Sequence, residues 1–89
     1  MKKDKILLTG SSGFIGFHVT KFLLDQKYNV IGVDNHNNYY DINLKLERCK
    51  KLKIYKNFRF FKLDIKNKKS VNDILKKFKP KFIIHLAAQ

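Results

Sequence analysis

A glycine-rich turn near the start of the chain constrains the possible folds more than any other feature. The apolar residues 5–9 lead into this turn, and a helical pattern follows at once over residues 14–26. A second apolar run, residues 29–33, ends on the carboxylate of Asp34. The turn contains Gly10, Gly13 and Gly16. Strand, glycine turn, helix, strand and acid in this order predict a unit of two parallel strands joined by a helix.

Each glycine of the turn has a distinct physical task. Gly10 lets the chain turn sharply off the strand, Gly13 exposes backbone that an anion can approach, and Gly16 lets the helix pack close to the sheet. The N–H groups around Phe14 and Ile15 have no partner within the helix and can face phosphates. We also expect these two side chains to supply apolar surface beneath the helix. The turn with its flanking elements predicts a dinucleotide site, whereas a glycine triplet alone also suits a plain strand-to-helix connection.

Asp34 predicts which dinucleotide would bind. It lies 18 residues after Gly16, at the end of the second predicted strand. A carboxylate there accepts hydrogen bonds from ribose hydroxyls and repels a 2′-phosphate. The next residues, Asn35, His36 and Asn37, supply no fixed positive charge. The sequence therefore favours NAD over NADP.

The rest of the chain continues the alternation of helices and strands. We predict a helix from Asp41, a strand over 58–63, a helix that starts at Asn67 or Ser70 and ends before Pro80, and a strand over 81–86. The apolar helical faces are Ile15, Val19, Phe22 and Leu23, then Ile42, Leu46, Cys49 and Leu52, then Val71, Ile74, Leu75 and Phe78. The order βαβαβαβ predicts an α/β fold, the N-terminal half of a Rossmann-type doubly wound parallel sheet. We expect residues 1–89 to form a partial NAD-binding domain, truncated before any catalytic remainder and substrate domain.

Composition argues against several other classes of protein. The formal charge is +13, but 18 of the 20 basic residues are Lys, whereas nucleic-acid sites favour Arg. Codon bias toward Lys, Asn, Ile, Phe and Tyr explains this charge without a nucleic-acid partner. Cys49 is the only cysteine, so we expect a packed thiol in a reducing cytoplasm. No apolar run approaches the ~18 residues of a membrane span, and we expect no membrane partner.

Polar and small residues follow the later strands. Asp64 and Ile65 come at the carboxyl end of the third strand, where ligands bind in open α/β sheets, although Asp64 could equally cap the next helix. Ala87 and Ala88 follow the fourth strand and leave room either for a cofactor or for a tight crossing. The three histidines form no metal set, and we expect His85 to be a hydrogen-bonded core residue.

These segments together resemble the NAD-dependent epimerase/dehydratase family, the extended short-chain dehydrogenases/reductases. The likeness is carried by residues 9–16, by Asp64-Ile65 and by residues 85–89, while residues 33–41 with Lys45 and Arg48 are most similar to the UDP-glucuronate 4-epimerases. The resemblance implies NAD as cofactor. It implies pyrophosphate contacts from the glycine turn, ribose contacts from Asp34, Asn35 and Asn38, and adenine between Asp64 and Ile65. Leu86, Ala87 and Ala88 would line the cofactor.

The catalytic residues of that family are not found in these 89 residues. Its chemistry needs a Ser or Thr and a Tyr-x-x-x-Lys dyad. Four residues after the four tyrosines come Gly32, Asn43, Leu44 and Arg59, so no dyad is present. The resemblance implies the NAD-binding portion of a nucleotide-sugar epimerase that acts on a UDP-sugar and is a homodimer at full length. The alternatives are part of a sugar-nucleotide dehydratase or a non-catalytic NAD-binding module.

Overall fold

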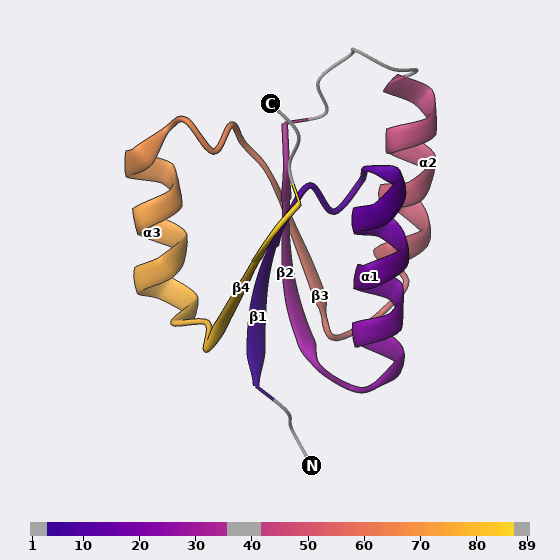
Figure 1. Ribbon diagram of the computed structural model, residues 1–89, viewed down its shortest axis with the longest axis horizontal. Coiled ribbons are helices and arrows are strands. Elements are labelled where there is room, and N and C mark those ends of the chain that lie inside the picture. Colours follow the sequence, from indigo (N-terminus) through magenta and orange to yellow (C-terminus); the bar gives the residue numbers. More distant parts are fainter. Residues whose placement is uncertain (1–3, 36–41, 87–89) are drawn as a thin grey trace.

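A computed structural model describes residues 4–35 and 42–86 of the chain. Strands and helices alternate throughout (Figure 1). The elements are β1 (Lys5–Thr9), α1 (Phe14–Asp25), β2 (Asn29–Asp34), α2 (Ile42–Leu52), β3 (Phe58–Lys62), α3 (Lys68–Phe78) and β4 (Phe82–His85). The predicted order βαβαβαβ is therefore confirmed, and no predicted strand end differs from the observed one by more than one residue.

The four strands form one parallel sheet in the order β3-β2-β1-β4. Leu7 of β1 lies between Ile31 of β2 and Ile83 of β4, which sets the register at the centre of the sheet. The chain moves outward from β1 through β2 to β3 and then crosses back to the far side of β1. Right-handed crossovers in opposite directions place helices on opposite faces of a sheet. Figure 1 shows this arrangement, with α1 and α2 on one face and α3 on the other.

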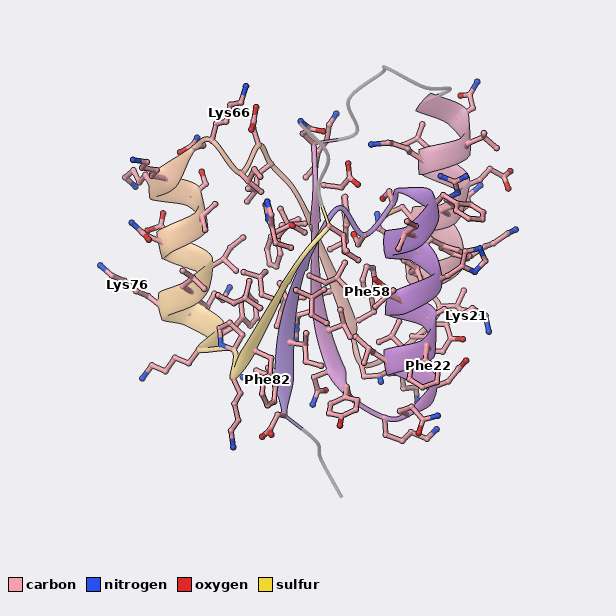
Figure 2. The ribbon with its side chains drawn as sticks, in the orientation of Figure 1. Lys21, Phe22, Phe58, Lys66, Lys76 and Phe82 are labelled. Carbon is pink, nitrogen blue, oxygen red and sulfur yellow. The ribbon has the colours of Figure 1, made fainter. Side chains whose placement is uncertain are left out.

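Two apolar clusters hold the layers together. The first joins the sheet to α1 and α2 and contains Leu8, Leu24, Val30, Leu52 and Phe58. Figure 2 shows Phe58 between the sheet and α1, whereas Lys21 and Lys76 extend outward from their helices. The second cluster joins the sheet to α3 and contains Leu7, Ile31, Val33 and Ile74. Apolar residues on both faces of β1 and β2 are typical of a parallel sheet covered by helices.

The buried face of α1 agrees with the predicted one only in part. The fully buried residues of the helix are Gly16, Thr20 and Leu24. Val19 and Leu23 pack against the first cluster as predicted, whereas Ile15 and Phe22 are 63% and 62% exposed. Phe14 is also exposed, so the expectation that Phe14 and Ile15 lie beneath the helix is wrong. The cause is the close contact between Gly16 and the glycine turn. Gly16 faces the turn at a distance that only glycine permits, because a Cβ there would overlap the carbonyl group of Gly10. Residues four and eight positions further along then face the sheet as well.

The other two helices follow the predicted pattern more closely. In α2, Cys49 and Leu52 are buried as expected, but Leu46 is half exposed. In α3, the predicted apolar residues all pack toward the sheet, with Ile74 buried. Asn67, one of the two predicted starting residues, caps this helix by accepting a hydrogen bond from the Ser70 amide at 3.2 Å. The predicted contributions of Asp41 and of the Ile42 side chain lie outside the described residues.

Candidate functional site

The glycine turn lies at the carboxyl end of β1 and is bonded to the end of β2. Gly10 has a φ of 79°, the left-handed conformation that glycine adopts without strain. Its amide donates to the Val33 carbonyl at 2.7 Å, and the Gly13 amide donates back to the Gly10 carbonyl at 3.1 Å. Ser11 and Ser12 are fully buried beneath the turn. These bonds hold the turn in one position relative to the two central strands.

The N-terminus of α1 has no side-chain cap. Gly13 occupies the cap position, no side chain there accepts a hydrogen bond, and the first turn contains no acidic residue. The first helical bond runs from the Phe17 amide to the Gly13 carbonyl at 2.8 Å, so the amides of residues 14–16 precede it. Asn67 caps α3 in the same chain, so the uncapped start of α1 differs from the start of α3. Uncapped amides at a helix N-terminus bind anions such as phosphate.

Asp34 ends β2 with its carboxylate buried beside the turn. Only 3% of its side chain is exposed. One carboxylate oxygen accepts the Ser12 amide at 3.1 Å, and the other accepts Lys45 Nζ at 3.3 Å. The acid therefore lies beside the glycine turn, as predicted, but with a cation that the sequence analysis had not placed there.

The lysine was missed because it comes from a different element. Lys45 belongs to α2 and is separated from Asp34 by 11 positions, whereas the residues directly after the acid carry no fixed positive charge. Its neighbour on the same helix, Arg48, donates to the Ser12 carbonyl at 3.2 Å and lies 5.8 Å from the centre of the Phe14 ring. The only sequence signal for both was their place in the segment that resembles the 4-epimerases. Lys45 and Arg48 together connect α2 to the end of β2 and to the glycine turn.

Thr9 and Leu86 join β1 to β4 at the point where the order of strands reverses. The Leu86 amide donates to both the carbonyl and the hydroxyl oxygen of Thr9, each at 3.1 Å. A hydrogen bond of 2.8 Å joins Thr9 Oγ1 to His85 Nδ1. His85 is hydrogen-bonded as expected, but it is exposed and not a core residue, because β4 forms an edge of the described sheet. In open α/β sheets the ligand binds at this reversal, outside the carboxyl ends of the strands.

The residues expected near adenine lie beyond β3. Ile65 helps to line a small apolar recess between the sheet and α3, together with Leu7, Thr9, Val33, Val71 and Ile74. Asp64 is exposed and accepts the Lys66 amide at 2.9 Å, which forms a local turn before α3. It does not cap the helix, because Asn67 has that role. Because Val71 and Ile74 of α3 line it, the recess lies on the face of the sheet that α3 covers, opposite to α1 (Figure 1).

The predicted site residues thus converge in part. One group of predicted residues lies at the carboxyl ends of β1, β2 and β4, with Ile65 in the recess on the α3 side of the sheet: Gly10, Gly13, Phe14, Ile15, Gly16, Asp34 and Leu86. Asn35 is exposed directly after Asp34. Asn38, Ala87 and Ala88 lie outside the described residues.

Other kinds of site find no support in the described part of the chain. No group of three His, Cys, Asp or Glu side chains there could hold a metal ion. None of its helices is both long and apolar enough to cross a membrane. Cys49 is buried, and burial raises the pKa of its thiol, as suits a packed and unreactive cysteine.

The uncapped helix and the buried acid fit an NAD molecule. The amides of α1 would face the pyrophosphate, and Asp34 would accept bonds from a ribose hydroxyl. The buried Ser11 Oγ lies under the same turn against Gly32 of β2, so it packs on the sheet and is not part of this surface. NAD supplies hydride transfer when it is bound. In the residues described, the chain contributes the surface that would bind and orient the cofactor.

Comparison with known proteins supports this assignment. Residues 7–89 match the model of the family described as GDP-mannose 4,6 dehydratase. The UDP-glucuronate 4-epimerase of Thermodesulfobacterium geofontis is 43% identical over 83 residues, which are 93% of this chain and 26% of that protein.

Two solved structures share the fold. UDP-glucuronic acid 4-epimerase from Bacillus cereus, in complex with UDP-glucuronic acid and NAD, is 34% identical with a TM-score of 0.83, covering 94% of this chain and 26% of that one. The dTDP-glucose 4,6-dehydratase of Bacillus anthracis, in complex with NAD, is 26% identical with a TM-score of 0.84, covering 98% and 27%. The chain spans about a quarter of the length of these relatives. By the family match and by its Rossmann-type sheet, the chain belongs to the NAD-dependent epimerase/dehydratase family.

Proposed function

We propose that this chain is the NAD-binding portion of a nucleotide-sugar 4-epimerase. The observation that carries the proposal is the uncapped N-terminus of α1, placed at the reversal of strand order and beside the buried carboxylate of Asp34. Gly10, Phe14 and Ile15 would contact the pyrophosphate. Gly13 would leave room for its approach, and Gly16 would hold the helix close to the sheet. Asp34, Asn35 and Asn38 would bind the adenosine ribose. Asp64 and Ile65 would flank adenine, and Leu86, Ala87 and Ala88 would line the rest of the cofactor.

The 4-epimerase is favoured over the dehydratase on similarity. The relative named as a UDP-glucuronate 4-epimerase is 43% identical, whereas one named as a probable dTDP-glucose 4,6-dehydratase, from Sinorhizobium fredii, is 34% identical. The proposed reaction is inversion at C4 of a UDP-sugar, for which NAD would supply reversible hydride transfer while the glycine turn and Asp34 would hold it in place. The Tyr-x-x-x-Lys dyad for this step is not in the sequence, so we expect the 89-residue chain to bind NAD without converting UDP-glucuronate.

Binding can be located by two-dimensional NMR of the labelled chain titrated with NAD. We expect shifts at the amides of residues 10–16, at Asp34 and at Ile65, and none at the start of α3. The variant Gly13→Val places a branched side chain where the pyrophosphate would approach and should abolish these shifts. Asn67→Ala, at the capped start of α3, is the matched control and should leave them unchanged. Shifts confined to α3, or none at all, would refute the proposal.

The choice between cofactors is a separate test. Titration calorimetry should give tighter binding of NAD than of NADP, because Asp34 repels a 2′-phosphate. Asp34→Ala should narrow the difference. A difference between NAD and NADP that is unchanged in Asp34→Ala would show that this carboxylate does not select the cofactor.

A further inference from the structure

Lys45 stands where it can change the selectivity that Asp34 provides. Its Nζ lies 3.3 Å from Asp34 Oδ1, and the two side chains are only 13% and 3% exposed. Ion pairs in the rest of the described chain are far more exposed: Lys21–Asp25, Lys69–Asp73 and Lys81–Asp4 have side chains at least 47% exposed. Water screens the Lys45–Asp34 pair least, so its charges act most strongly on a group placed beside it.

An ion pair and a bare carboxylate affect a 2′-phosphate differently. A lone carboxylate beside the ribose repels the phosphate, which carries up to two negative charges. Lys45 offsets this repulsion and itself attracts the phosphate, since its ammonium lies within one hydrogen-bond length of the carboxylate. A neutral 2′-hydroxyl experiences little of either effect. The comparison therefore identifies Lys45, and not a residue directly after Asp34, as the positive charge that acts on a 2′-phosphate.

We infer that Lys45 is a specificity-determining residue of the adenosine end, which reduces the discrimination against a ribose 2′-phosphate that Asp34 alone would impose. The inference rests on the proposed function, because it assumes that a dinucleotide ribose lies beside Asp34. It makes selectivity a property of two elements, β2 and α2, that meet only in the folded chain. It also predicts that NADP binds more tightly than the carboxylate alone would allow.

Two other cationic residues, Arg48 and Lys62, lie near Asp34 but form no ion pair with it among the described residues. Arg48 donates to the Ser12 carbonyl and lies over the Phe14 ring, so its guanidinium is committed to the turn. Lys62 is the register partner of Asp34 on β3, but it is exposed and forms no ion pair with the acid among the described residues. Lys62 is therefore a matched control: it has the same charge and is a sheet neighbour of Asp34, but its side chain is exposed to water.

The test measures dissociation constants for NAD and NADP by titration calorimetry on the 89-residue chain and its variants. In K45M the ratio of the NADP constant to the NAD constant should rise roughly tenfold, which corresponds to ~1.4 kcal/mol. In K62M the ratio should stay within about twofold of the unmutated chain, as expected for a screened surface charge. An equal ratio in K45M and the unmutated chain, with NAD still bound, would overturn the inference and leave the proposed function intact.

K45M leaves the carboxylate of Asp34 buried without its cation, and this variant could fail to fold. A second pair of variants, D34N and the double variant, keeps the inference testable in that case. In D34N the repulsion is gone while Lys45 remains, so the ratio should fall below that of the unmutated chain. Adding K45M to D34N should weaken NADP binding roughly tenfold and leave NAD binding almost unchanged. An unchanged NADP constant between D34N and the double variant would overturn the inference. Failure of the unmutated chain to bind either dinucleotide would overturn the proposed function and this inference with it.

Discussion

Gly16 of α1 lies directly against the carbonyl group of Gly10, and a Cβ on Gly16 would come within 2.7 Å of the Gly10 carbonyl carbon. Both partners are backbone, so neither can move aside without moving β1 or α1. This contact sets how closely the helix approaches the sheet, and it determines which face of α1 is buried. The glycine turn therefore controls the packing of α1, in addition to the anion-binding role that we propose for it.

The first prediction concerns this contact. Gly16→Ala should destabilise the fold by about 3 kcal/mol, the upper end of the usual cost of overpacking, because the overlap is with backbone. Gly13→Ala is the control: its Cβ would lie 3.3 Å from the Gly10 oxygen, a tight but tolerable contact. Thermal unfolding followed by circular dichroism should show a much lower midpoint only for Gly16→Ala. Equal midpoints for the two variants would contradict the packing role of Gly16.

The second prediction concerns the start of α3. Asn67→Ala removes the oxygen that accepts the Ser70 amide and should cost about 1 kcal/mol of stability. Asn67→Asp retains an acceptor oxygen, so its unfolding midpoint in urea should lie close to that of the unmutated chain. If both variants lost the same stability, the side-chain oxygen would not be the source of the effect.

The third prediction concerns pH. Burial raises the pKa of the Cys49 thiol, so the folded state holds this proton more tightly than the unfolded state. The resulting stabilisation is complete below the pKa of the unfolded thiol and is lost as pH rises through the folded pKa. The difference in unfolding free energy between the unmutated chain and Cys49→Ala should therefore shrink above about pH 9. A difference in unfolding free energy that is constant from pH 7 to 10 would contradict the raised pKa of Cys49.

Thiol accessibility offers a parallel check on Cys49. A disulfide reagent should label the folded chain slowly at pH 8 and the urea-unfolded chain at once, because the side chain is buried and held as the thiol. Rapid labelling without denaturant would show that α2 opens readily from the sheet.

The fourth prediction concerns β4, which forms an edge of the described sheet. Phe82 and Ile83 on this strand are 51% and 58% exposed, and an open apolar edge favours pairing with another chain. Ile83→Lys should reduce association of the 89-residue chain, as measured by size-exclusion chromatography with light scattering. Ile54→Lys changes an equally apolar residue that is 81% exposed after α2, away from β4, and should have little effect.

The salt dependence of self-association gives an independent test of the role of the β4 edge. The chain carries a formal charge of +13, and copies of it repel one another at low ionic strength. Added salt screens this repulsion, so association should increase with salt in the unmutated chain. A strict monomer at every salt concentration, with a reversible two-state melt, would show that the β4 edge does not drive association.

The sequence alone determined the order of elements, their bounds and the position of the glycine turn. These are local properties, because strands and helices follow from apolar runs and helical spacing, and turns follow from glycine and proline. The sequence also placed Asp34 at the end of β2, because the position of this residue directly after an apolar run is enough to predict that. The cap at Asn67 was predictable in the same way, apart from the choice between two neighbouring polar residues.

Only the tertiary structure decided which residues of α1 face the sheet and which cation meets Asp34. Apolar spacing suggested a face with Ile15 and Phe22, but the close approach of Gly16 to Gly10 rotated the helix so that both are exposed. The contact of Lys45 with Asp34 joins two elements whose separation along the chain carries no periodic signal. Such contacts depend on how helices pack across a sheet, and that packing is set by many side chains at once rather than by any short segment.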